Sequence, residues 1–201
     1  IFIKKMSINA DEVIDEINAL RTNPSGYARK IRKYAGYFEG KILKVPGATA
    51  GIKTNEGKEA YEEAADYLSG ATPVEAFEQC DGLNRIAQDF LSQVVRTDPS
   101  RAGEIDMESI INRHGEFSGN FSRAMEFGAA TSEQVVINLV VSDGDRTRGQ
   151  RDSLLNGNLK KVGVATGEHN TYRTATVIVS CTKFNSLLNG NLKKVGVATG
   201  E

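Results

Sequence analysis

The sequence contains few of the residue types on which catalysis and metal binding most often depend. Its 201 residues include two histidines, two cysteines and no tryptophan. The cysteines, Cys80 and Cys181, are too few for a disulfide scaffold, so we expect two packed free thiols, with one long-range bridge as the alternative. The formal net charge is only −1, and this balance gives no reason to expect nucleic acid as a partner.

Long apolar runs and targeting signals are absent as well. No run of about 18 apolar residues exists, so we expect no membrane span. Residues 1–5, Ile-Phe-Ile-Lys-Lys, lack the basic, apolar and small-residue order of a secretory signal. We therefore expect Met6 to be the true start, residues 1–8 to be an N-terminal extension and the protein to be cytoplasmic. The alternative is that residue 1 follows a removed signal and that the protein is extracellular.

The hydrophobic pattern predicts helices through most of the chain and strands at its end. Helices are predicted over residues 9–21, with Asn9 as the cap, 27–37, 54–68, 83–95, with Asp81 as the cap, and 132–141, with a short helical turn over 107–112. Strands are predicted over 160–166 and 172–183. Residues 39–53 are expected to form a loop and 113–130 an irregular segment, so any further strand must lie in these stretches. Helices followed by strands favour an α+β fold.

Residues 153–168 recur unchanged as residues 186–201. Repeats that stack into solenoids diverge in detail and need at least three units, so we interpret the second copy as a recent duplication or an assembly artefact. The alternative is an added or swapped edge strand that pairs with a neighbouring chain. We assign residues 9–184 to one domain and residues 185–201 to a C-terminal tail.

Several short motifs, taken in order, resemble those of a known family. Residues 18–24, Asn-Ala-Leu-Arg-Thr-Asn-Pro, resemble the first helix of CAP/SCP domains, the superfamily of cysteine-rich secretory, antigen-five and pathogenesis-related proteins. Four other stretches resemble the protist branch of this family. They are residues 54–60, the helix at 83–94, Asp143-Gly144 with Arg-Gly-Gln-Arg at 148–151, and Val-Gly-Val-Ala at 162–165. The resemblance covers about residues 9–184. It implies an α-β-α sandwich, with a three-stranded antiparallel sheet between helical layers.

The residues that would form the CAP cleft depart from the family pattern. CAP domains typically carry two histidines and two acidic residues that can hold a divalent metal, because imidazoles and carboxylates are ligands of zinc-type ions. Here Gln150 stands in place of the loop histidine, with Arg151 after it, and Phe90 in place of the helix histidine. Arg123 falls near the family's glutamate, and Glu104 near the remaining acidic position. The resemblance thus implies a vestigial cleft, and we expect no metal, no cofactor and no catalytic residue.

The other chemistry-bearing residues are weak candidates. His114 lies close to Glu116 in sequence, and His169 falls in an apparent hairpin turn; a single loop histidine is more typical of a hydrogen-bonded residue than of a catalyst. Asp143-Gly144-Asp145 is similar to the start of a calcium loop, but the further ligands of an EF-hand are missing. The basic run at residues 29–33 predicts a solvated helix face, or else a surface that docks on an acidic protein.

These observations favour a binding or structural role over catalysis. The sequence has no nucleophile-elbow motif and no Gly-rich phosphate loop, so a hydrolase is the least favoured hypothesis. The first hypothesis is a non-catalytic CAP-like module that binds other proteins in a larger assembly, which the protist resemblance suggests is cytoskeletal or ciliary. The alternative, which also rests on the resemblance, is a secreted CAP protein that binds a sterol or another lipid in an apolar groove.

Overall fold

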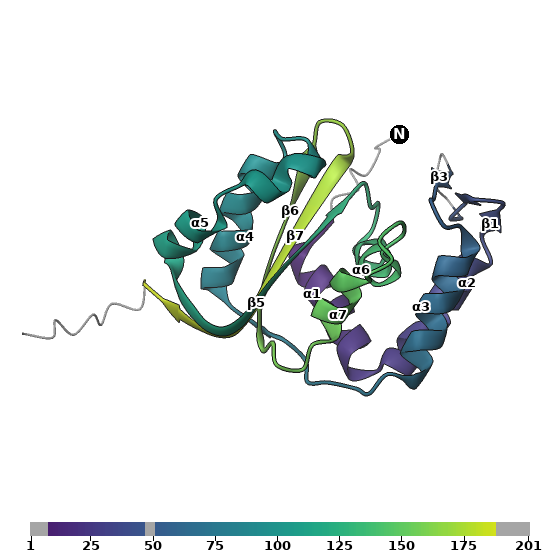
Figure 1. Ribbon diagram of the computed structural model, residues 1–201, viewed down its shortest axis with the longest axis horizontal. Coiled ribbons are helices and arrows are strands. Elements are labelled where there is room, and N and C mark those ends of the chain that lie inside the picture. Colours follow the sequence, from purple (N-terminus) through teal and green to yellow (C-terminus); the bar gives the residue numbers. More distant parts are fainter. Residues whose placement is uncertain (1–7, 47–50, 188–201) are drawn as a thin grey trace, which may run out of the picture.

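The computed structural model describes residues 8–46 and 51–187, so the predictions made for residues 1–7 and 188–201 lie outside the described part of the chain. The main sheet has four strands in the order β4-β6-β7-β5 (Figure 1). Strands β6, β7 and β5 are antiparallel neighbours, and the short β4 pairs in parallel with β6. Their bounds are Glu78–Gln79 for β4, Gly115–Phe127 for β5, Lys161–His169 for β6 and Arg173–Ser186 for β7. The expected α+β class, with three antiparallel strands, is confirmed.

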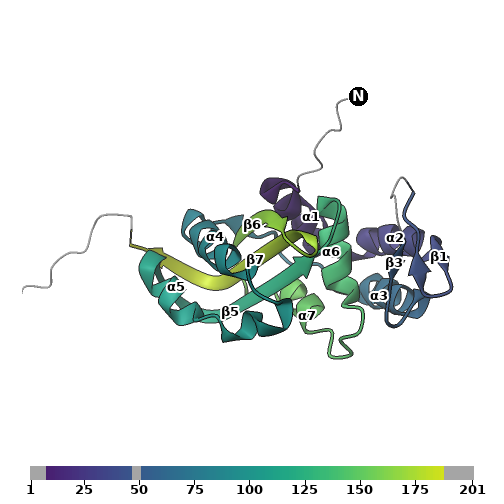
Figure 2. The ribbon, with the colours of Figure 1, turned by 90° about the horizontal axis from the view of Figure 1, so that it is seen from above.

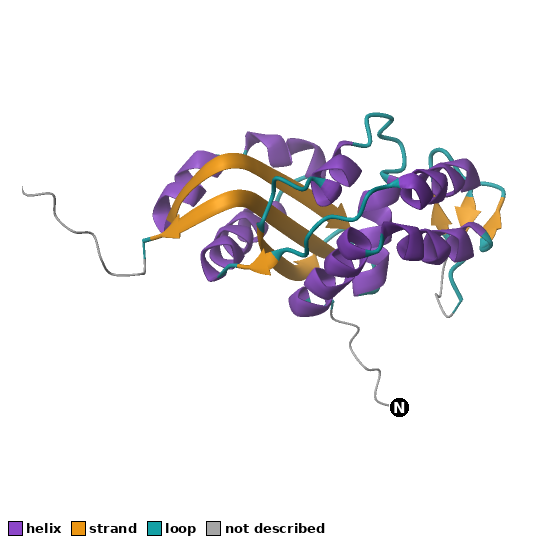
Figure 3. Cartoon of the chain, turned by 90° about the horizontal axis from the view of Figure 1, so that it is seen from below, coloured by secondary structure: helices purple, strands orange, loops and turns teal. Residues whose placement is uncertain are grey.

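Helices contact both faces of this sheet. Helices α1, α6 and α7 lie on one side and α4 and α5 on the other, and Figure 3 shows them flanking the curved strands. Helices α2 and α3 pack on each other and stand outside α1 and α6 (Figure 2). No helix within residues 8–46 and 51–187 is long and apolar enough to cross a bilayer. The bounds are α1 Ala10–Thr22, α2 Pro24–Ala35, α3 Lys58–Gly70, α4 Asp81–Val94, α5 Met107–His114, α6 Ser132–Val141 and α7 Gly149–Leu155, with a 3₁₀ helix at Pro99–Glu104.

Helix α4 packs closely against the sheet because β6 has a glycine, Gly163, at the point of contact. A Cβ atom on Gly163 would lie 2.1 Å from the backbone carbonyl carbon of Leu83, so the helix can approach this closely only where the strand has no side chain. The buried stripe of α4, which includes Phe90, then packs on Val177 and Val179 of β7. Alternation along the strands turns Val164 and Ile178 to the opposite face, where they join the core under α1 and α6.

Capping residues explain several helix boundaries. Asn9 caps α1 as predicted, since its side chain accepts the N–H of Asp11 at 2.8 Å. The second helix was expected from residue 27 but begins at Pro24, because Asn23 caps it and proline is tolerated in a first turn. The prediction for α4 was wrong in its cap: Cys80 occupies the cap position and Asp81 is the first helical residue.

The two stretches in which any further strand was expected do contain strands, but the short β4 at Glu78–Gln79 lies outside both. Residues 39–53 are not a simple loop, since part of this stretch forms a small antiparallel sheet of β1 Phe38–Glu39, β2 Ile42–Leu43 and β3 Ile52–Lys53. Most of residues 113–130 form β5, which pairs with β7 along its length. A register shift between Ser118 and Phe121, with Gly119 at a φ of 80°, interrupts the alternation of side chains there. Because of this bulge, apolar and polar residues do not alternate regularly along the strand, and the sequence pattern does not indicate it.

The two cysteines do not form a bridge. Both are free thiols. Cys80 directly follows β4, Cys181 belongs to β7, and β6 runs between these two strands. Two inter-strand spacings of about 4.8 Å separate the Cα atoms by more than the roughly 7 Å that a disulfide tolerates. Burial raises the pKa of the Cys181 thiol to about 12, which is typical of a packed and unreactive cysteine.

Candidate functional site

The loop between α6 and α7 begins and ends in strained backbone. Ser142 and Arg148 adopt φ values of 48° and 54°, in the left-handed region that non-glycine residues rarely occupy. One guanidinium links the two ends, because Arg148 donates from Nη1 to the carbonyl oxygen of Ser142 at 2.8 Å. Strain of this kind persists only where the surrounding contacts hold it in place.

Two arginine–glutamate pairs fasten this loop and α7 to the region of α3, and we call these four residues the loop clamp. Arg148 donates to both carboxylate oxygens of Glu56, at 2.7 and 2.8 Å. This pairing lowers the pKa of Glu56 to about 2. Arg151, which is 1% exposed, donates to both oxygens of Glu63 at 2.7 and 2.6 Å. Its Nε also donates to the carbonyl oxygen of Val140. Arg151 thus joins α7 to both α3 and α6.

Asp143 adds a second fastening between the same parts of the chain. Its carboxylate accepts the backbone N–H groups of Asn55 at 2.7 Å and Glu56 at 2.8 Å. The neighbouring Asp145 accepts the N–H and hydroxyl of Thr147. The two carboxylates that were considered for calcium therefore serve as hydrogen-bond acceptors within the loop region.

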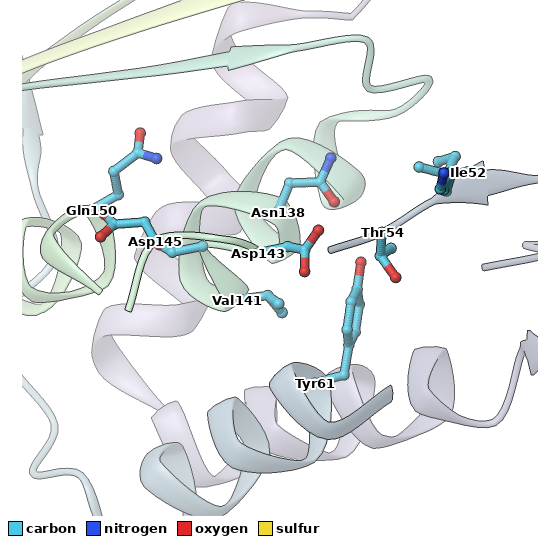
Figure 4. Close-up of a pocket in the computed structure, with 10 residues that line it drawn as sticks. Ile52, Thr54, Tyr61, Asn138, Val141, Asp143, Asp145 and Gln150 are labelled. Carbon is cyan, nitrogen blue, oxygen red and sulfur yellow. The ribbon is translucent and has the colours of Figure 1, made fainter. Parts of the chain in front are cut away.

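A small polar pocket opens beside the clamp, and we call it the Tyr61 pocket. Figure 4 shows Tyr61 pointing from α3 toward Asp143 and Thr54, with Asn138 of α6 and Gln150 of α7 further along the wall. Its volume is about 220 Å³, below the roughly 300–1,000 Å³ of pockets that enclose drug-sized ligands. Burial, together with the charges of Asp143 and a nearby glutamate, raises the pKa of Tyr61, which keeps its hydroxyl protonated. The pocket lining thus holds neutral polar groups, the two carboxylates of Asp143 and Asp145, and the cation Lys53.

The nearby glutamate is Glu126, a residue that the sequence analysis did not select. It is 6% exposed, and its carboxyl oxygens accept the side-chain N–H of Asn138 at 2.8 Å and the backbone N–H of Ala129 at 3.2 Å. Burial dominates over these two hydrogen bonds and raises its pKa to about 7. Asn138 is the one polar residue within the apolar run of residues 135–141. A lone amide on a buried helix predicts a polar partner, and that signal could have led to Glu126.

The structure brings some residues of the predicted vestigial cleft together and places Glu104 elsewhere. Phe90 and Arg123 come together, with the guanidinium carbon of Arg123 4.5 Å from the centre of the buried phenyl ring. Gln150 lies beside the same strand, where its Oε1 accepts the N–H of Met125 at 3.3 Å. Glu104 instead is exposed and pairs with Arg101.

This set does not fit a divalent cation, since a phenyl ring offers no lone pair and a guanidinium repels positive charge. In the described residues, three or more His, Cys, Asp or Glu side chains nowhere gather in a way that could hold a metal.

The two histidines have structural surroundings. His114 closes α5 and contacts Asp89 of α4, with its Nε2 2.9 Å from the carboxylate, rather than Glu116. Glu116 lies exposed at the start of β5, where the Asn185 side chain donates to it at 3.5 Å. His169 is the last residue of β6 and is 6% exposed, and its Nδ1 accepts backbone N–H groups of the hairpin turn. Neither histidine faces the Tyr61 pocket.

Comparison with known proteins finds only distant similarity in fold. No protein-family model matches the sequence, and no curated protein sequence matches it. A cysteine-rich secretory protein of Staphylococcus aureus has 13% identity and a TM-score of 0.40, over 62% of this chain and 38% of that one. An outer surface protein of Borrelia burgdorferi has 14% identity and a TM-score of 0.45, over 72% of this chain and 99% of that one. This chain therefore spans well under half of the Staphylococcus protein.

Proposed function

We propose that this chain is a CAP-like α-β-α domain that binds another protein and catalyses no reaction. In this proposal it works as a structural module of a larger cytoplasmic assembly, cytoskeletal or ciliary in kind. The order of its sequence motifs supports the family and the setting. The presence of helices on both faces of a sheet with three antiparallel strands agrees with the sandwich that the resemblance implies.

The proposal rests on one observation: the polar side chains of this loop bind other parts of the same chain. In the loop where the resemblance places cleft chemistry, Arg148 and Arg151 are each bound by both oxygens of a glutamate. Gln150 is bound to the backbone of β5. These groups hold two helices, a strand and a strained loop in one arrangement. A loop that is fixed on a rigid scaffold is suited to present a surface to a partner.

Calorimetric titration of the full chain with zinc tests the non-catalytic part of the proposal. We expect no stoichiometric binding at micromolar zinc, because Gln150 and Arg123 replace potential ligands. Micromolar binding that is lost in Gln150→Ala or Glu104→Ala would refute the proposal. The matched control is Gln88→Ala, an exposed glutamine on α4, which should leave the titration unchanged.

Affinity purification tests the protein-binding part. The full chain is cross-linked in its source cells, the captured protein is identified, and the purified pair is recombined. We expect the recombined pair to bind at micromolar concentration or better. If no captured protein rebinds the purified chain, the proposed function fails.

One observation favours the alternative function, in which the protein is secreted and holds a sterol or fatty acid. An apolar groove of about 440 Å³ lies between α5 and β5, lined in part by Met107, Ile111, Phe117 and Phe121. Extraction of the purified protein with organic solvent, followed by mass spectrometry, tests this alternative. A stoichiometric lipid that is lost in Phe117→Ser would establish it.

A further inference from the structure

The groove between α5 and β5, here called the α5–β5 groove, lies next to an open strand edge. Strand β5 is at the edge of the main sheet, and β7 is its one strand neighbour among the described residues. Near the end of β5 the N–H of Met125 points outward, where Gln150 accepts it. Backbone groups alternate along a strand, so those of Phe121 and Arg123 face outward as well. An edge of this kind can accept an added strand.

The side chains beside that edge are apolar in the middle. Phe117 is 38% exposed, and its ring lies 4.9 Å from that of Phe121. Met107 and Ile111 of α5 form the opposite wall. Apolar side chains of an added strand, spaced two residues apart, would point into this groove.

Charges of opposite sign lie along β5 on the two sides of its apolar stretch. Glu116 borders the groove where β5 begins, and Glu108, in the first turn of α5, borders it as well. Arg123 lies just beyond the groove lining, two residues past Phe121 on the same face of the strand, and is half-buried over Phe90. Among residues 8–46 and 51–187, no carboxylate pairs with Arg123. Burial alone lowers its pKa, which agrees with a cation that no nearby anion stabilises.

We propose that the α5–β5 groove binds an extended peptide of a partner protein, which adds a strand to β5 and places apolar side chains between a basic and an acidic residue. The basic residue meets Glu116, and the acidic residue meets Arg123. This inference rests on the proposed protein-binding function and adds the surface and the chemistry of the partner. A peptide accounts for the open edge and for charges of both signs, whereas a sterol would use neither and a fatty acid would use only the positive charge.

The distance between the charged ends sets the length of the probe. Residues 116–123, with one extra residue in the bulge, occupy seven strand positions, so their ends are about 20 Å apart. The probes are two capped, fluorescein-labelled heptapeptides, Lys-Thr-Leu-Thr-Leu-Thr-Glu and the charge-reversed Glu-Thr-Leu-Thr-Leu-Thr-Lys, which represent the two strand directions. Fluorescence anisotropy with the full chain should show that one probe binds at least about tenfold more tightly than the other. The Phe117→Ala variant should weaken that binding by about tenfold, since it removes one wall of the groove.

Charge reversal provides the decisive comparison. Arg123→Glu should weaken the preferred peptide by about tenfold, and replacing the peptide's glutamate by lysine should restore binding to this variant but not to the wild type. Arg29→Glu, an exposed change on the distant α2, is the matched control and should have no effect. Thermal melts by circular dichroism confirm that each variant is folded.

Several outcomes would overturn the inference. These are the absence of binding by both peptides, equal binding of both charge orders, or an Arg123→Glu variant that binds like the wild type. Binding of dodecanoate without either peptide would identify the groove as a lipid site. Self-association that Phe117→Ala abolishes would identify the occupant as a second copy. A partner found by affinity purification that binds wild type and Arg123→Glu equally would overturn this inference alone and leave the proposed function standing.

Discussion

Glu126 makes the stability of the protein depend on pH in a direction that the structure fixes. Its pKa is raised from 4.5 to about 7 in the folded protein. Between these values the folded state holds a proton that the unfolded state has released, so the free energy of unfolding falls as the pH rises and levels off above pH 7. At about 1.4 kcal/mol per pH unit, the interval corresponds to about 3 kcal/mol. Little discount for solvent is needed, because the side chain is 6% exposed.

The test is urea unfolding of wild type and Glu126→Gln, followed by far-ultraviolet circular dichroism at pH 5, 6, 7 and 8. The glutamine has the same shape, and a rotated Asn138 amide can hydrogen-bond to it, so the variant should lose the pH dependence and exceed the wild type by about 3 kcal/mol at pH 8. Glu59→Gln, an exposed change on α3, should follow the wild-type curve. If the curves of wild type and Glu126→Gln run parallel from pH 5 to pH 8, the reasoning is wrong.

Two further predictions concern stability and use the same unfolding assay at pH 7. Arg151→Ala should lower the free energy of unfolding by about 3 kcal/mol, because it removes a buried side chain, leaves the carbonyl of Val140 without its donor and leaves Glu63 with only its 3.4 Å contact to Arg148; a change below about 1 kcal/mol would mean that the loop clamp is not needed for stability. Gly163→Ala should cost about 2–3 kcal/mol, because the new Cβ would collide with the backbone of Leu83. Gly157→Ala, whose Cβ would make an ordinary 3.4 Å contact, should cost about 1 kcal/mol or less and serves as the control.

The sequence predicted those elements whose hydrophobic pattern is continuous and local. Helix α6 has the expected bounds, residues 132–141, and the β6–β7 hairpin lies where the two valine-rich runs place it. Helix α7 was missed because its seven residues bury little more than Arg151 and Leu154, and a buried arginine gives no hydrophobic signal. Strand β5 was missed because its bulge breaks the period of two on which strand prediction depends.

The candidate site could be predicted only where it follows a motif along the chain. The resemblance placed Gln150 and Arg151 in one loop, whereas the structure has them as neighbours in the first turn of helix α7. The partners of that loop, Glu56 and Glu63, lie 88–92 residues away in sequence, and nothing local in the sequence identifies which glutamate meets which arginine. Glu126 was missed for a related reason, since its raised pKa comes from burial beneath α6 and not from its sequence neighbours.

The contrast between Arg151 and Arg123 strengthens the case for an external partner. Both are positions that the resemblance assigns to the vestigial cleft, and both are withdrawn at least partly from water. Arg151 is compensated by a bidentate carboxylate and a backbone carbonyl, whereas Arg123 has only the face of Phe90 among the described residues. A half-buried cation without an anion lowers the stability of the free protein. A carboxylate brought by a partner would offset that cost only in the complex, so binding at this end of the groove should be strongly favoured by charge and should weaken as the ionic strength rises.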